Sequence, residues 1–165
     1  MKATIKRLIL NLLGRNELLR LATIRTDGWP QATTVTYAND GLTLYVMCAK
    51  NAQKARNIRN NPKVSLTVDR ETKDWNRIKG LSMAAYAEIV RDREEIQRAT
   101  ALLGRKFKEV AAMDEADLKT VSILRITPQV ISVLDYTKGF GHTDLVRLPR
   151  RRPRPARTAR RRGKT

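Results

Sequence analysis

Short β-rich segments separated by tight turns constrain the fold of this chain more than any other feature of its sequence. Asp27-Gly28 and Asn39-Asp40-Gly41 are signals of the kind that close β-hairpins. The segments 21–26, 31–37 and 42–48 around them are rich in residues that suit a pleated strand. Three strands joined by two such turns predict an antiparallel meander.

The rest of the chain adds strands and small helices. Strands are predicted at 64–68, at 81–90, and at 121–127 and 130–134 around Pro128, as one bent strand or as two. Helices are predicted over 5–14, from an Asn51 cap to residue 60, from an Asp92 cap to a stop at Gly104, and within 106–119. About six mostly antiparallel strands with small flanking helices indicate a mainly β (α+β) fold that closes, wholly or partly, into a barrel.

The positive charge of the chain is concentrated at its C-terminus. The 165 residues carry a formal charge of +18, and residues 147–165 hold ten basic and no acidic side chains. We therefore expect one domain over 1–148 and a disordered, Arg- and Pro-rich basic tail over 149–165. Such a tail attracts nucleic acid without sequence specificity; a solubilising tail with no partner is the alternative.

Several classes of protein are disfavoured by composition. No apolar run is long enough for a membrane span, and the N-terminus lacks the features of a secretory signal. Cys48 is the single cysteine, which excludes an internal disulfide and fits a cytoplasmic location. One histidine and one cysteine also make a metal site an unfavourable interpretation.

The segment 48–56 is the strongest candidate for a binding site. It takes a predicted strand directly into a helix, where free backbone N–H groups and the positive end of the helix dipole attract anions. Lys50 and Lys54 add positive charge, with Arg56 and Arg59 close in sequence. The pattern predicts a phosphate site, and the alternative is a solvated basic helix.

Two further regions offer polar groups. On the Thr-rich strand, Thr33 and Val35 are expected on one face and Thr34 on the other, where they could bind the polar rim of a planar ring. His142, in a glycine-rich loop, is a candidate acid or base, and Tyr136 a candidate for ring stacking. Structural roles are the alternative for both.

The ordered set of motifs resembles one family. The segment 21–31, LATIRTDGWPQ, and the segment 54–66, KARNIRNNPKVSL, resemble the pyridoxamine 5'-phosphate oxidase-like, FMN-binding split-barrel superfamily. Ala87-Glu88 in a long strand and Pro128 before a closing strand also fit. The resemblance spans roughly residues 5 to 146. It implies a six-stranded split barrel that forms a homodimer, with two flavin sites at the interface.

The resemblance also implies site residues. Lys54 matches the phosphate-binding lysine of the family, and Gln53 stands where an arginine is common. The remaining matches are the ring-lining Thr33, Thr34 and Val35, the strand end Met47 and Cys48, and the flavin-contacting Ser82.

The chain also departs from the vitamin B6 oxidases of the family. Thr33 and Ala38 replace the arginine and lysine of the second strand, and Phe140-Gly141-His142 keeps only the histidine of the substrate motif. We therefore expect a flavin (FMN)-dependent oxidoreductase whose substrate is not a vitamin B6 compound. The alternatives are an F420-dependent reductase, a haem protein as in related branches, and a non-catalytic flavin-binding protein whose tail attracts nucleic acid.

Overall fold

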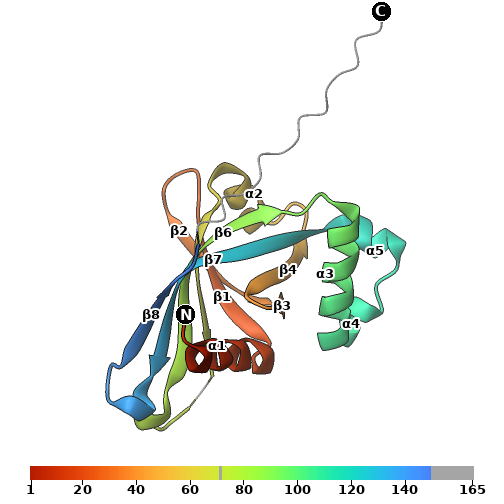
Figure 1. The fold of residues 1–165 in the computed structure, drawn as a ribbon. Helices are drawn as coiled ribbons and strands as arrows, with labels where there is room; N and C mark the ends of the chain where they lie inside the picture. Colours follow the sequence, from red (N-terminus) through yellow and green to blue (C-terminus); the bar gives the residue numbers. More distant parts are fainter. Residues whose placement is uncertain (71, 150–165) are drawn as a thin grey trace, which may run out of the picture.

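The computed structural model describes residues 1–70 and 72–149, in which strands carry more residues than helices. The strands form one strongly curled antiparallel sheet with the order β2-β1-β5-β6-β7-β4-β3, and β8 pairs with β7 (Figure 1). The strands are β1 Leu18–Ile24, β2 Pro30–Thr36, β3 Ala38–Asp40, β4 Thr43–Ala49, β5 Lys63–Asp69, β6 Lys79–Ile89, β7 Val121–Asp135 and β8 Thr143–Arg147. The predicted mainly β, split-barrel fold is confirmed, with eight strands in place of six.

The first predicted hairpin is confirmed. Leu18 to Ile24 pair with Thr36 to Pro30 in register, and the turn between them contains Gly28 at φ 87°. This backbone conformation is disfavoured for residues that carry a Cβ atom, so glycine is required there. The Asp27 carboxylate accepts a hydrogen bond from the backbone N–H of Trp29 at 3.2 Å and closes the turn.

The predicted three-stranded meander is wrong, because β2 and β4 are not partners. The second turn joins β3 to β4, and β4 pairs with β7 instead. The chain changes from one edge of the sheet to the other at Tyr37, which is fully buried. Its hydroxyl donates to the carbonyl of Leu13 at 2.8 Å, and its N–H donates to the carbonyl of Glu17 at 3.2 Å. Burial of this large side chain fixes the crossing and curls the sheet.

The residues on both sides of Pro128 form one strand. Ala85 pairs with Pro128 and Ala84 pairs with Val130, so Gln129 is an extra residue in a β-bulge. Proline has no N–H group for the ladder, and a bulge accommodates it while bending the strand. The last strand, β8, was not expected from the sequence.

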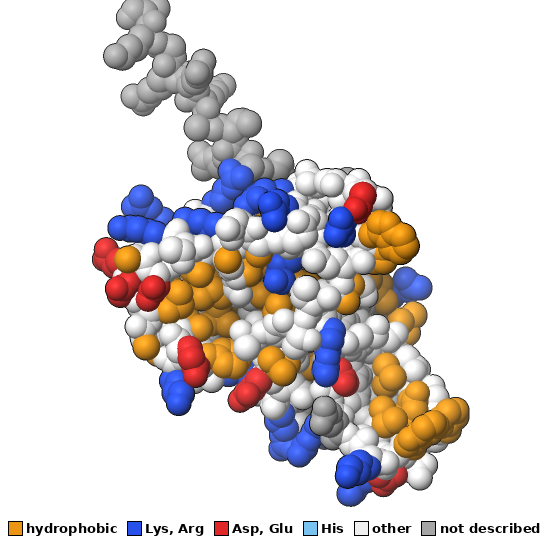
Figure 2. Space-filling model, turned by 180° about the vertical axis from the view of Figure 1, so that it is seen from behind, with side chains coloured by type: hydrophobic (Ala, Val, Ile, Leu, Met, Phe, Trp, Pro, Cys, Tyr) orange, Lys and Arg blue, Asp and Glu red, His pale blue; other side chains and the backbone are white. Residues whose placement is uncertain are grey.

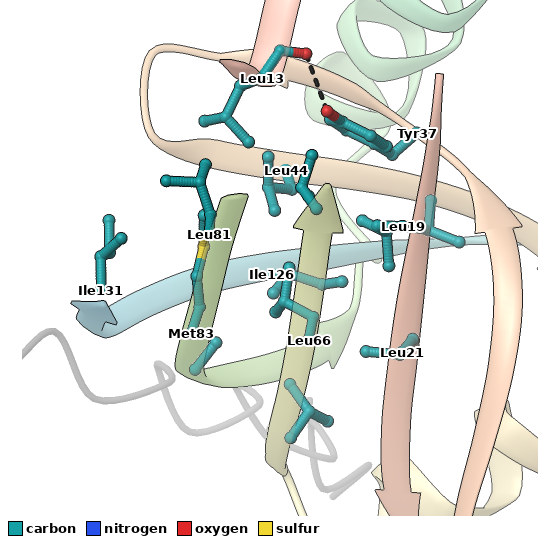
Figure 3. Packing of buried hydrophobic residues seen from close by; sticks show 14 of the residues in the cluster. Leu13, Leu19, Leu21, Tyr37, Leu44, Leu66, Leu81, Met83, Ile126 and Ile131 are labelled. Atoms are coloured by element: carbon teal, nitrogen blue, oxygen red, sulfur yellow. Dashed lines mark hydrogen bonds between the residues drawn. The ribbon is translucent and has the colours of Figure 1, made fainter. Parts of the chain in front are cut away.

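The core fills the inside of the curled sheet. Apolar side chains from the inner faces of the strands meet the buried face of helix α1 (Ala3–Arg15), as Figure 3 shows for Leu13, Leu66 and Ile126. Each fully buried side chain of this size contributes about 1.5–3 kcal/mol relative to its exposed form. The sheet is therefore held mainly by burial of its concave face.

The helices agree only partly with the prediction. The Asp92 cap of α3 (Arg93–Lys106) is confirmed, since its carboxylate accepts from the N–H of Glu95 at 2.9 Å. Gly104 does not end this helix; a Cβ atom there would meet Ala111 at 3.5 Å, so the glycine lets α3 pack closely against α4. The other helices are α2 Gln53–Asn60, α4 Lys108–Ala111, α5 Glu115–Thr120 and the short 3-10 helices η1 Trp75–Arg77 and η2 Tyr136–Lys138.

Two sequence-based expectations concern the limits of this unit. The expected domain boundary near residue 148 follows β8, and the expected basic tail lies, apart from Pro149, outside the described residues. Among residues 1–70 and 72–149, no helix is long and apolar enough to cross a membrane.

Candidate anion site at the start of helix α2

Three cations gather where β4 ends and α2 begins. Arg59 donates from its guanidinium to the carbonyl of Lys50 at 3.1 Å, and Lys54 is half-buried on the first turn of α2. The N–H of Lys50 donates to the carbonyl of Thr120, which fixes the loop against α5. We refer to Lys50, Lys54 and Arg59 as the α2 cations. None of the three forms an ion pair with a carboxylate of the described residues.

The N-terminus of α2 has no side-chain cap. The predicted Asn51 cap is wrong: the N-cap residue is Ala52, which has no side-chain acceptor, and the first turn contains no acidic residue. Within the described part of the chain, no acceptor meets the backbone N–H groups of Gln53 and Lys54. Unsatisfied N–H groups, the helix dipole and the α2 cations together favour a bound anion such as phosphate.

A buried polar network holds α2 in place. The amide of Asn57, which is fully buried, donates to the hydroxyl of Thr23 at 2.9 Å and to the side-chain carbonyl of Gln31 at 3.1 Å. It accepts from the side-chain amide of Gln53 at 2.8 Å. Because Thr23 lies on β1 and Gln31 on β2, the network fixes the helix to the first hairpin. Sequence reasoning missed Asn57; its i+4 spacing from Gln53 was the available signal.

Cys48 lies beside this site as a neutral thiol. Its side chain packs against the barrel core, and burial raises its pKa, while the charges of Lys54 and Arg59 act in the opposite direction. The thiolate is the reactive form of cysteine, so the raised pKa favours a packing role. The preceding residue, Met47, packs against the second buried cluster, which includes Tyr45 of β4 and Leu103 of α3.

The predicted ring-lining residues divide between the two faces of the sheet. Thr33 and Val35 are half-buried, and Thr34 is exposed opposite Arg20 of β1, as the alternation predicted. Gln31, two residues before Thr33 on the same face of β2, meets α2 through Asn57. Ser82 is half-buried on β6, opposite Thr67 of β5 and Ser132 of β7, and its neighbours Leu81 and Met83 point to the other face, into the core.

The predicted substrate residues lie at the other end of the barrel. Tyr136 and His142 belong to the β7–β8 turn, at the lower left of Figure 1, far from α2 at the top. The ring of Tyr136 tilts against Phe140 with centroids 5.5 Å apart, and Nε2 of His142 is 3.2 Å from an oxygen of Asp144. One copy of the chain therefore does not bring these two residues to the anion site. The described residues include no cluster of three or more potential metal ligands.

Comparison with known proteins connects this geometry to a family. General stress protein 26 of Bacillus subtilis is 26% identical over 133 residues, which are 79% of this chain and 89% of that protein. The haem oxygenase HutZ of Vibrio cholerae is 28% identical over 127 residues, which are 74% of this chain and 70% of that protein.

Solved structures agree on the fold. The crystal structure of general stress protein 26 from Bacillus anthracis superposes with a TM-score of 0.67 at 19% identity, over 87% of this chain and 98% of that one. A sequence model described as pyridoxamine 5'-phosphate oxidase matches residues 5–135. Because this match covers most of the sequence, the chain belongs to the pyridoxamine 5'-phosphate oxidase family.

Proposed function

We propose that this protein is a flavin-dependent oxidoreductase that binds FMN with its phosphate at the start of α2. The observation that carries the proposal is the uncapped helix N-terminus, with free N–H groups at Gln53 and Lys54, beside the α2 cations. A phosphate there would satisfy both donors and neutralise charge that no carboxylate of the described residues meets. Family membership supports the choice of a flavin as the carrier of that phosphate.

The other predicted contacts extend from this point along the strands. Thr33, Thr34 and Val35 of β2 would line the ring and its side chain, and Met47 and Cys48 would lie at the end of β4. A bound flavin supplies the redox chemistry, and the protein supplies orientation and electrostatics. In this chain, Lys54 holds the phosphate and Asn57 holds the helix that presents it. We assign no residue as acid or base, and the electron acceptor remains open.

We also propose that two copies form a homodimer with the cofactor at their interface. The convex face of the sheet carries small side chains such as Ala22, Ala32 and Ala84, and leaves Leu18 and Ile24 exposed. A face with small and exposed apolar side chains suits a second copy. Ser82 lies on this face, so its predicted flavin contact requires the partner, as do contacts from Tyr136 and His142.

Three alternatives use the same fold differently. The α2 cations would equally hold the phosphate of the deazaflavin F420. A haem protein, as the name of HutZ describes, would use His142, the one histidine of the sequence, whose ring is oriented by Asp144. A non-catalytic protein would bind flavin without turnover and retain nucleic acid through residues 149–165, in a manner that salt abolishes.

Titration of the purified protein with FMN, F420 and haem, followed by absorption, distinguishes these proposals. We expect FMN to bind and Lys54→Met to weaken it at least about tenfold, because a charge-assisted hydrogen bond contributes about 1.5–3 kcal/mol. Lys6→Met on α1 removes the same charge from an exposed position elsewhere and should leave binding unchanged. Equal FMN affinities for all three proteins would refute the phosphate assignment, and binding of haem or F420 alone would select that alternative.

A further inference from the structure

A pocket on the outside of the barrel is not used by the proposed function. Residues of α3, α4 and α5 and of the adjoining ends of β4 and β7 line a space of about 1130 Å³. In the view from behind, hydrophobic side chains gather in this region on the left of the molecule, with basic side chains above them (Figure 2). Its size exceeds that of most sites for small ligands.

The walls of the pocket are apolar. They are formed by aliphatic and thioether side chains, including Ile89, Ile96, Val110, Met113 and Ile123. Ala101 of α3 presents only a methyl group to this space. Replacing water in such a cavity by an apolar ligand lowers the free energy of the system.

The rim of the pocket is positively charged. Lys50, Arg93, Arg105 and Lys119 line it, and no acidic residue does. We call these four residues the cationic rim. None of them forms an ion pair with any carboxylate in the part of the chain that the structure describes. The acidic residues at the start of α5 are already engaged, because Asp114 and Asp117 form a reciprocal capping box.

The pocket is preformed, because α3 is fastened at both ends. Near its start, the buried carboxylate of Glu95 accepts from Tyr45 at 3.0 Å and from Arg125 at 2.7 Å. At its end, the ammonium of Lys106 donates to the carbonyl of Asn16 and lies 4.2 Å from the ring centroid of Tyr37. Between these anchors, Ala99 and Leu103 of α3 belong to the same buried cluster as Tyr45 and Ile123, so the position of α3 is set without a ligand.

We propose that this pocket binds an amphipathic organic anion, with an apolar body between α3 and β7 and a negatively charged head at the cationic rim. Apolar walls select the body of the ligand, and charges that lack a protein partner select its head. The proposal does not require a bound flavin. Lys50 is shared with the anion site at α2, so the ligand head would lie beside that site.

The test measures binding of 1-anilinonaphthalene-8-sulfonate by fluorescence, without added flavin, and its displacement by dodecanoate or by dodecanol. We expect dodecanoate to displace the dye at least about ten times more effectively than dodecanol, since only the acid reaches the rim with a charge. The double variant Arg93→Gln/Arg105→Gln should lose this preference. The matched control Arg98→Gln, on the same helix and outside the pocket lining, should keep it.

A second variant tests the apolar wall. Ala101 is exposed to the pocket, so Ala101→Trp should narrow the space without disturbing the core and should weaken dye binding. Unchanged dye binding in this variant, or equal displacement by the acid and the alcohol, would overturn the proposal. FMN titration of Arg93→Gln/Arg105→Gln separates this proposal from the proposed function, since the flavin affinity of this variant should remain that of the wild type.

Discussion

The two ends of the barrel differ in how their positive charges are neutralised. At the β7–β8 turn, Lys79 lies 3.3 Å from Asp135, and Lys138 lies 2.9 Å from Asp144. At α2, on the opposite end in Figure 1, the α2 cations form no such pair with the described residues. The difference indicates that charge near the turn serves the fold, whereas charge near α2 is available to a ligand.

The polar groups beneath α2 have hydrogen-bond partners, unlike the groups at the start of the helix. The helix end that faces solvent lacks partners, but the amide of Asn57 below it has every partner it needs. The unsatisfied groups are therefore confined to the surface where an anion can reach them. This arrangement predicts that stability and ligand binding can be changed separately.

The largest effect is expected from removing the buried network. Asn57→Ala leaves Thr23 and Gln31 without a donor, and an unsatisfied buried group costs about 1–3 kcal/mol. We expect the free energy of unfolding, measured by urea denaturation, to fall by that amount. Asn60→Ala removes an exposed hydrogen bond to Arg56 on the same helix and should cost much less. Equal losses would show that the network does not hold α2.

A smaller effect is expected from supplying the missing cap. Ala52→Asp places a carboxylate on the free N–H groups of α2, which should raise the free energy of unfolding by about 0.5–2 kcal/mol. The same carboxylate occupies the proposed phosphate position, so FMN affinity should fall about tenfold or more. Ala52→Ser supplies a cap without a charge, so it separates the effect of capping from the effect of the negative charge. A variant that gains stability and keeps full FMN affinity would place the phosphate elsewhere.

The smallest effect is expected from acid at the β7–β8 turn. Burial alone would raise the pKa of Asp135, but hydrogen bonds from Thr137 and Lys79 and the charge of Lys79 outweigh it and lower the pKa. A lowered carboxyl pKa contributes stability above the ordinary Asp value of about 4, and this stability is lost as the pH falls through the folded-state pKa. The melting temperature should therefore fall more steeply for the wild type than for Asp135→Asn as the pH is lowered from neutral to below about 4. Parallel curves would exclude this contribution.

Local features were the predictable part of the fold. Gly28 marks the first hairpin because only glycine adopts its backbone conformation without strain, and Asp92 marks the start of α3 because its carboxylate caps the helix. Alternation placed Thr33 and Thr34 on opposite faces correctly. The prediction failed for Asn51, because the helix begins one residue later, with Ala52 at the N-cap position and no side-chain cap.

Partners distant in the sequence were the unpredictable part. The turn at residues 39–41 was recognised, but nothing local reveals that β4 pairs with β7, because both possible partners of β4 have strand-like sequences. The candidate site shows the same division. Lys54 was visible as a cation after a strand, whereas the contact of Asn57 with Thr23 joins residues 34 positions apart.

The sequence alone determined the turns, the start of α3, the alternation of strand faces and the family resemblance, because these depend on residues within a few positions of one another. The tertiary structure decided the order of the strands, the burial of Asn57 and the pocket between α3 and β7. These depend on which apolar surfaces meet when the sheet curls around Tyr37 and the core side chains shown in Figure 3. Burial of apolar surface has no preferred direction along the chain, so many pairings satisfy the same pattern and only packing selects among them.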